Sequence, residues 1–196
     1  MHYDKIHEDP YVDANGTLKN LAGITDTALL QKEEALQVFA RQSELWEKPI
    51  PGHYDAQHVR AVHRHLFQDV FAWAGEFRTV GLSKGDSMFC VPAFIESQLN
   101  RIGADLVRED FLRGLVPIQF SERAAYFLDE WNAIHPFREG NGRTQRALLT
   151  QLARACGFDL RWAKVTRAEI TEASIASAHR ADNSHFAALL LREIAG

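Results

Sequence analysis

The chain has 196 residues, of which 46% are hydrophobic and 24% charged, and its net charge is −4. This composition suits one globular domain over residues 1–196 and lacks the basic footprint of a nucleic-acid-binding protein. No apolar run reaches the roughly 20 residues that span a bilayer, and the first residues lack a signal-peptide pattern. The two cysteines, Cys90 and Cys156, do not form a disulfide framework. We therefore expect a cytoplasmic protein that acts neither on membranes nor directly on nucleic acid.

The first half of the chain predicts helices after an irregular start. Residues 1–24 mix polar residues with turn formers, which predicts an arm that packs on the rest of the chain. Apolar residues at helical spacing predict a first helix over residues 27–45. A second helix is expected over residues 55–73, with Asp55 as its N-cap and Gly75 as its end.

Residues 76–91 carry the only clear strand signal, because two short extended pieces flank a turn-rich centre. They predict a β-hairpin with a loose tip. A helix is then expected over residues 92–107, with Pro92 in its first turn. The next helix should begin at Ser121 as its N-cap and end near Ile134.

The remaining pattern is helical, and the whole predicts a mainly α fold: a helical bundle with one β-hairpin. Pro136 disfavours the helical conformation at the residue before it, which explains the stop near Ile134. Further helices are expected over residues 141–156, 167–179 and 183–194.

Residues 135–146, HPFREGNGRTQR, combine features that suit phosphate binding. Gly140 and Gly142 flank Asn141, and such a loop can turn several backbone N–H groups inward around an anion. The helix that follows contributes its unpaired N–H groups and the positive end of its dipole. This combination predicts a phosphate site at the helix start.

Four of the charged or titratable side chains in this segment suit chemistry on a phosphate. Arg143 and Arg146 are three residues apart in the first helical turns, so they share a face and indicate a polyphosphate. Glu139 is suited to anchor Mg²⁺, an ion that uses few protein ligands beside phosphates. His135 has a side chain of the right basicity to take a proton from a hydroxyl group.

The segment HPFREGNGRTQR resembles the Fic-family signature HPFx[D/E]GNGRxxR at every defined position. The stretches DPYVDANGTLKNLAGI and LFQDVFAWAGEFR and the hairpin region also look like small bacterial Fic toxins, so the resemblance covers most of the chain. It implies the Fic fold, with residues 76–91 as a β-hairpin flap. It also implies a protein adenylyltransferase that transfers AMP from ATP to a Tyr, Ser or Thr hydroxyl of a target protein.

The resemblance assigns a role to each part of the motif. His135 is the catalytic base, and Glu139 holds the Mg²⁺ that bridges the α- and β-phosphates. Relatives that act as kinases carry a lysine at the position of Gly142, so its absence favours AMP transfer. The nucleotide-binding residues are Gly140, Asn141, Gly142, Arg143 and Arg146.

The resemblance also places a target-docking surface on the hairpin. In the family, a target segment is held there by strand addition, which brings its hydroxyl near the histidine. Asn183 is a further candidate, for the adenine pocket. The docking candidates on the flap are Lys84, Gly85, Asp86, Ser87, Met88 and Phe89.

Regulation is inferred from a missing motif. Many Fic enzymes are restrained by a helix with the pattern [S/T]xxxE[G/N], whose glutamate pairs with the second motif arginine. The nearest match here is residues 43–48, SELWEK, where a lysine replaces the final residue and an ordinary helix end is the better interpretation. The resemblance therefore implies a separate small antitoxin whose glutamate contacts Arg146. By resemblance, the leading targets are the ATPase subunits of DNA gyrase and topoisomerase IV.

Three alternatives remain open at this point. His58, His63 and His65 form a possible metal cluster, but helical spacing separates His63 from the other two, and ordinary helix histidines are favoured. The protein could instead be a non-catalytic module that binds a nucleotide and a partner. It could also be a Fic transferase with another donor, such as UTP or a CDP-linked group.

Overall fold

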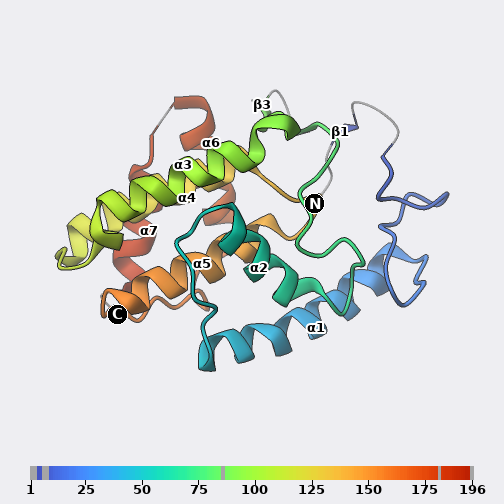
Figure 1. Cartoon of the computed structure of the whole chain (residues 1–196), viewed down its shortest axis with the longest axis horizontal. Coiled ribbons are helices and arrows are strands. Elements are labelled where there is room, and N and C mark those ends of the chain that lie inside the picture. The colour runs from blue at the N-terminus through green and yellow to red at the C-terminus, as the bar shows by residue number, and fades with distance from the viewer. Residues whose placement is uncertain (1–3, 6–8, 85–86, 181, 195–196) are drawn as a thin grey trace.

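The computed structural model describes residues 4–5, 9–84, 87–180 and 182–194 (Figure 1). Two 3₁₀ turns, Pro92–Phe94 and Asp110–Leu112, flank the helix α3. No helix in the described ranges combines the length and apolar character needed to cross a bilayer. The helices are α1 Thr27–Glu47, α2 Ala56–Phe67, α3 Ile95–Arg108, α4 Pro117–Ile134, α5 Asn141–Ala155, α6 Arg167–Arg180 and α7 Ser184–Ile194.

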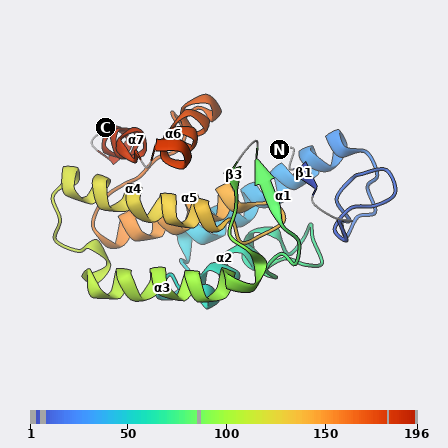
Figure 2. The ribbon, with the colours of Figure 1, turned by 90° about the horizontal axis from the view of Figure 1, so that it is seen from above.

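The predicted mainly α class is confirmed, and α4 is the central helix of the bundle. It packs against α3, α5, α6 and α7, while α2 packs against α1, α3 and α5. Figure 2 shows α4 and α5 side by side, so the loop that joins them lies at one end of the central pair. The core between these helices is apolar, and it includes Phe120, Ala124, Phe127, Trp131, Leu148, Leu149 and Leu152.

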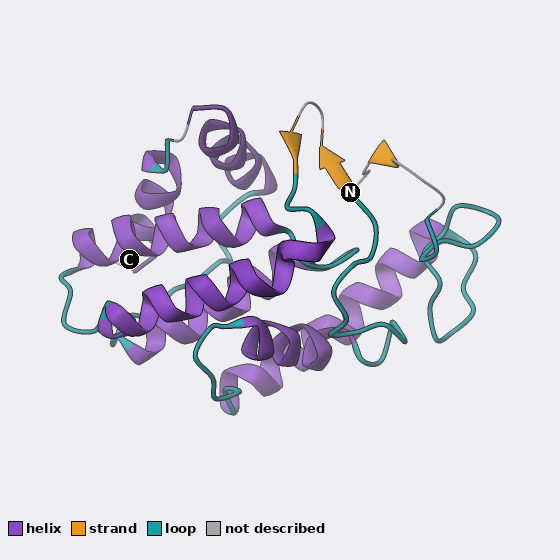
Figure 3. Cartoon of the chain, turned by 45° about the horizontal axis from the view of Figure 1, so that its top comes forward, coloured by secondary structure: helices purple, strands orange, loops and turns teal. Residues whose placement is uncertain are grey.

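The predicted hairpin forms, but its strands are shorter than expected and a third strand joins it. Strand β2 (Leu82–Lys84) pairs antiparallel with β3 (Ser87–Met88), and β1 (Asp4–Lys5) pairs with the other edge of β2. Figure 3 shows these strands at one edge of the helical bundle. The expected hairpin is therefore confirmed, and β1 extends it to a small sheet of three strands. An edge strand offers unpaired N–H and C=O groups, and the extended start of the chain pairs with them.

Two predicted helix boundaries were wrong. Helix α2 ends at Phe67, not at residue 73, because the chain then tightens into turns in which the amides of Val70 and Phe71 both donate to the Phe67 carbonyl. Helix α4 begins at Pro117, a residue suited to the first helical position. Ser121 lies inside that helix, and its Oγ donates to the Pro117 carbonyl instead of capping.

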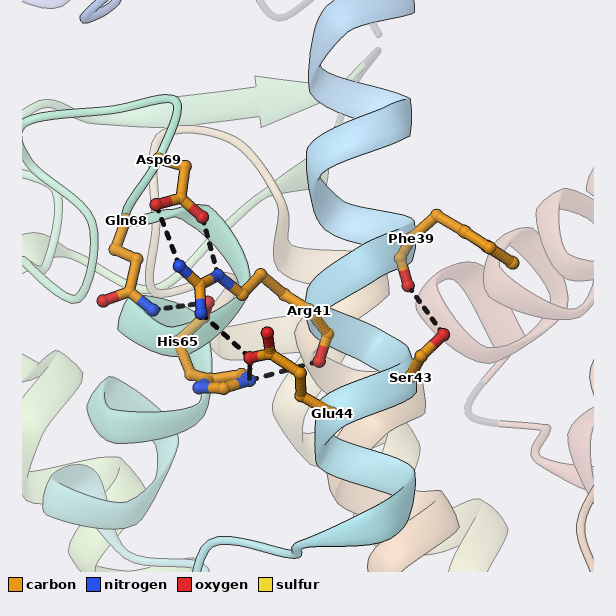
Figure 4. A network of polar contacts seen from close by, with 7 residues as sticks. All are labelled: Phe39, Arg41, Ser43, Glu44, His65, Gln68 and Asp69. Atoms are coloured by element: carbon orange, nitrogen blue, oxygen red, sulfur yellow. Dashed lines mark hydrogen bonds and ion pairs between the residues drawn. The ribbon is translucent and has the colours of Figure 1, made fainter.

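Helix α1 lies on the surface, and its apolar residues do not all face the core. Phe39 is 70% exposed, whereas the buried side chains are Leu30, Glu34, Val38 and Leu45. Figure 4 shows how α1 is fastened to the end of α2: Arg41 Nε lies 2.6 Å from Asp69 Oδ2, and His65 Nε2 donates to the Arg41 carbonyl. Ser43, in the nearest match to the inhibitory motif, is exposed and donates to the Phe39 carbonyl within the same helix.

Candidate functional site

His135 follows the last residue of α4 in a left-handed conformation, with φ 50° and ψ 62°. This conformation is costly for a residue other than glycine and often marks a functional site. The imidazole is 5% exposed, and burial lowers its pKa from 6.5 to about 3, so the ring is neutral at pH 7. Its Nδ1 lies 3.3 Å from the Asn132 carbonyl, an acceptor, so Nδ1 carries the proton and Nε2 has the basic lone pair.

The loop after His135 is closed by the side chain of Asn141. The Phe137 amide donates to Asn141 Oδ1 at 2.9 Å, and Asn141 Nδ2 donates to the Phe137 carbonyl at 2.8 Å. Phe137 is fully buried, as expected for a residue that fixes the loop to the core. Among residues 136–142, only Gly140 has a positive φ, of 83°. A Cβ added to Gly140 would lie 2.4 Å from the ring of Phe67. Asn141 and Gly142 are instead the first residues of α5, so the amides that can bind an anion belong to the helix start.

Arg143 lies between two carboxylates. Its Nη2 is 2.6 Å from Oε1 of Glu34 in α1 and 3.6 Å from Oε1 of Glu139. The guanidinium carbon also lies 4.8 Å above the centroid of the Phe67 ring. Glu34 is 6% exposed, and its burial raises its pKa although Arg143 opposes the shift. Glu34 could not be identified from the sequence because it lies more than 100 residues from the motif.

Arg146 differs from Arg143 because no carboxylate in the described ranges lies within ion-pair distance of its guanidinium. The side chain is half-buried, and burial together with the nearby Arg143 lowers its pKa. A cation without a partner in a partly buried position favours an anionic ligand. Arg146 thus extends the positive region that begins at the amides of α5.

Two buried polar contacts, also missed from the sequence, hold the motif loop in place. His63 is fully buried: its Nδ1 accepts from the Gly75 amide at 2.8 Å, and its Nε2 donates to the Glu139 carbonyl at 3.1 Å. Arg138 Nε donates to Asp9 Oδ2 at 2.8 Å, which fastens the N-terminal arm to the loop. His63 thus joins the loop backbone to α2, and the side chain of Arg138 joins the loop to the N-terminal arm.

The three helix histidines have structural roles, but two of them are more buried than expected. His58 accepts from the Tyr54 amide and contacts the Ile50 carbonyl, and burial lowers the pKa of both His58 and His63. The residues that the structure describes contain no group of three or more side chains suited to hold a metal ion. We therefore interpret these histidines as backbone-binding residues of α2.

Arg78 is a further residue that could not be identified from the sequence. Its side chain is buried, and it donates to the carbonyls of Val80 at 2.7 Å, His135 at 2.8 Å and Ile134 at 3.2 Å, and to that of Cys90. Residues 77–80, FRTV, are the first of the two extended pieces expected within residues 76–91, but they form no strand. They lie beside the motif loop, where the Arg78 amide donates to the Pro136 carbonyl at 2.9 Å. The only signal in the sequence is a lone arginine in the stretch AGEFR.

The flap reaches the catalytic candidate through Phe89, whose ring stacks on His135 with centroids 3.9 Å apart. Lys84 and Met88 are exposed, which suits docking residues. Gly85 and Asp86 lie outside the described residues, as does the side chain of Ser87. Oδ1 of Asn183, before α7, is buried without a hydrogen-bond partner in the described part of the chain, and its place in an adenine pocket stays a prediction.

Comparison with known proteins identifies relatives along nearly the whole chain. The chain is 44% identical over 185 residues to the protein adenylyltransferase VbhT of Bartonella schoenbuchensis, covering 94% of this chain but only 38% of VbhT. It is 39% identical over 178 residues to the probable protein adenylyltransferase y4lH of Sinorhizobium fredii, covering 90% and 91% of the two chains.

Solved structures show the same fold. The N-terminal Fic domain of a Bartonella quintana Bep effector, with bound ADP, superposes with a TM-score of 0.86 at 28% identity and 93% coverage of both chains. The Bartonella tribocorum protein BepC, with bound AMPPNP, gives a TM-score of 0.85 at 25% identity and covers 93% of this chain and 94% of BepC. Residues 53–153 match the Fic/DOC family, so the predicted Fic fold is confirmed and this chain belongs to that family.

Proposed function

We propose that this protein is an adenylyltransferase that transfers AMP from ATP to a Tyr, Ser or Thr hydroxyl of a target protein. Relatives at 44% and 39% identity carry the name protein adenylyltransferase, and related structures bind AMPPNP and ADP. The observation that carries the proposal is the neutral imidazole of His135, which is joined by one short loop to a helix start that carries two arginines.

The nucleotide is held by the start of α5. The amides of the first helical turn bind the α-phosphate, since they have no partners within the helix. Arg143 and Arg146 bind the β- and γ-phosphates through planar, bidentate guanidinium groups. This arrangement neutralises the charge that develops on pyrophosphate as it leaves.

His135 activates the incoming hydroxyl. Nε2 takes the proton while the hydroxyl oxygen attacks the α-phosphorus, and the bond between that phosphorus and the bridging oxygen to the β-phosphate breaks. The products are a phosphodiester between AMP and the target, pyrophosphate, and a protonated imidazole. The hydrogen bond from Nδ1 to the Asn132 carbonyl keeps Nε2 as the acceptor at the start of this step.

The residues present fit a Mg²⁺ ion. The Glu139 carboxylate is partly exposed and accepts from the Gly140 amide, so one of its oxygens is fixed at the edge of the phosphate site. A single carboxylate suits Mg²⁺, which takes its other ligands from phosphates and water. Glu139 would hold the ion, which would neutralise phosphate charge and orient the triphosphate.

The target segment docks on the flap by strand addition. Strand β2 already has a partner on each side, whereas β3 is an edge of the sheet. Main-chain pairing with an edge strand holds an extended segment without strict dependence on its sequence. Lys84, Met88 and Phe89 then contact its side chains and bring the hydroxyl toward His135.

Arg146 is the proposed point of regulation. The guanidinium has no carboxylate partner in the described ranges. A separate small antitoxin with an [S/T]xxxE[G/N] helix can supply the glutamate that pairs with it, and this pairing would exclude the phosphate that Arg146 otherwise binds. The chain would then be the toxin of a toxin–antitoxin pair, active in the cytoplasm. The ATPase subunits of DNA gyrase and topoisomerase IV are the proposed targets.

The test is label transfer in a bacterial lysate. With the wild-type protein, label from [α-³²P]ATP but not from [γ-³²P]ATP should enter a protein band, and unlabelled UTP or a CDP-linked compound should not compete. His135→Ala should abolish transfer while leaving Mg-ATP binding intact. Binding without transfer in the wild type would favour the non-catalytic module, and competition by UTP would favour another donor.

A further inference from the structure

A single buried guanidinium joins both stems of the flap to the backbone that carries His135. Arg78 donates to Val80, just before β2, and to Cys90, just after β3. The same side chain donates to the last carbonyl of α4, at Ile134, and to that of His135. The Cys90 amide adds a direct link to the Ala133 carbonyl at 3.1 Å.

These contacts meet a specific structural need. The last carbonyls of a helix have no partners within the helix, and a cation there is favoured by the helix dipole. His135 must also leave the helix in a left-handed conformation, with φ 50°, that is unfavourable for a residue other than glycine. Because the carbonyl of His135 accepts from Arg78 Nε at 2.8 Å, the orientation of this peptide group is set by Arg78.

The four carbonyls that Arg78 contacts in the described ranges, at residues 80, 90, 134 and 135, lie outside residues 139–146, the proposed nucleotide site. Within the described part of the chain, the charged groups that act on the imidazole include Arg78 itself and Lys84 of the flap, and both disfavour its protonation. Arg78 therefore influences the base and the docking strand, but not the groups that would hold the phosphates.

We infer that Arg78 is a positioning residue that sets the orientation of His135 relative to the flap, so that a docked hydroxyl and the imidazole meet in one geometry. The inference rests on the proposed role of His135 as the base. It separates two properties: Arg78 controls the rate of transfer, and the helix start controls nucleotide affinity.

The experiment compares Arg78→Lys with the wild type in steady-state transfer and in Mg-ATP binding by calorimetry. Lysine keeps the charge, but its single ammonium cannot reproduce the planar fork that reaches several carbonyls. A misplacement of the base by about 1 Å costs on the order of 100-fold in rate. We expect kcat to fall by about that factor while the Kd for Mg-ATP changes less than about threefold. Guanidinium ion added to Arg78→Ala should restore part of the rate.

Arg60→Lys is the matched control. Arg60 also donates from Nε to a main-chain carbonyl, that of Gly75 at 2.9 Å, and lies over the Phe77 ring. Gly75 lies outside the stems of the flap. The kcat of Arg60→Lys should therefore stay within about threefold of the wild-type value. Arg78→Gln, which keeps two donors, serves as the second variant if the lysine variant does not fold.

The outcomes separate this inference from the proposed function. A wild-type kcat in folded Arg78→Lys would overturn the inference. A fold-loss of Mg-ATP affinity as large as the fold-loss of kcat, accompanied by a lower thermal stability, would also overturn it. If the wild type itself transfers no AMP, the proposed function fails. In that case, NMR decides the role of Arg78. The chemical shifts of the His135 ring should change in Arg78→Lys and should stay unchanged in Arg60→Lys. Unmoved resonances in both variants would contradict the inference.

Discussion

The ring of Phe89 lies flat on the imidazole of His135, with centroids 3.9 Å apart and 16° between the two planes. One residue of the flap thus covers the proposed catalytic base, and together with the helix end it excludes water from the ring. This contact links target docking to catalysis, because any segment that pairs with β3 lies beside the residue that covers His135.

Removal of that cover should raise the pKa of His135. Desolvation is the largest cause of its low pKa of about 3, and Phe89→Ala admits water that favours the protonated ring. The expected result is a shift toward 6.5, measured by NMR titration of the His135 ring protons. Met88→Ala is the control, since Met88 is 69% exposed and its loss leaves the ring covered. An unchanged His135 pKa in Phe89→Ala would show that the aromatic contact does not control desolvation.

The two glycines of the motif should respond oppositely to alanine. Gly140 has φ 83°, and an added Cβ would lie 2.4 Å from Phe67, so Gly140→Ala should lower the free energy of unfolding by about 2–4 kcal/mol. Gly142 is helical, and its added Cβ meets only the end of Arg146, at 3.4 Å. Gly142→Ala should therefore raise the free energy of unfolding by about 0.5–1 kcal/mol. Urea denaturation measures both, and equal losses would contradict the assigned loop conformation.

The buried pair between Glu34 and Arg143 should contribute to stability. Glu34→Ala leaves Arg143 with only the more distant Glu139, at 3.6 Å, so we expect a loss of about 2 kcal/mol in the free energy of unfolding. Glu34→Gln keeps an acceptor of the same shape and should lose about half as much. Glu47→Ala, at the exposed end of α1, should change the free energy by less than about 0.5 kcal/mol. An effect of Glu34→Ala as small as that of Glu47→Ala would argue against the pair.

The buried histidines predict that stability falls in acid. The folded pKa values of His63 and His135 are about 3, below the unfolded value of 6.5, so between these values the unfolded chain binds more protons. Each histidine therefore lowers the free energy of unfolding by up to about 1.4 kcal/mol per unit of falling pH in that window. Asp129 acts in the opposite direction, because burial raises its pKa to about 6.

A paired measurement isolates the histidine contribution from that of Asp129. The free energy of unfolding of the wild type and of His63→Phe should be measured by denaturant titration from pH 7.5 to 5. The difference in the free energy of unfolding between the two proteins should stay constant above pH 7. Below pH 6.5 the wild type should lose more stability than His63→Phe, because phenylalanine binds no proton. A difference that does not depend on pH would contradict a neutral, buried His63.

The parts that could be predicted from the sequence were those with local causes. The stop of α4 before His135 follows from Pro136, and the positive φ of 83° at Gly140 is a conformation that glycine adopts without a steric cost. The identities of the charged residues in the motif likewise indicated phosphate chemistry. Each of these inferences depends on neighbours within a few positions of the chain.

The parts that were missed have long-range causes. Glu34, His63 and Arg78 reach the motif from three other segments, and nothing in their immediate neighbours marks them. The third strand escaped prediction for the same reason, because β1 forms only where β2 offers an edge. The sequence shows which residues can bind an anion, whereas only the fold shows which residues hold them in place.

In the proposed reaction, the start of α5 presents the α-phosphorus of ATP to His135. The most direct test is a crystal structure with Mg²⁺ and a non-hydrolysable ATP analogue. We expect the triphosphate to contact the first amides of α5 and the guanidinium groups of Arg143 and Arg146, with the α-phosphate nearest to His135 Nε2. A triphosphate bound away from this helix start, or with its γ-phosphate facing His135, would contradict this expectation.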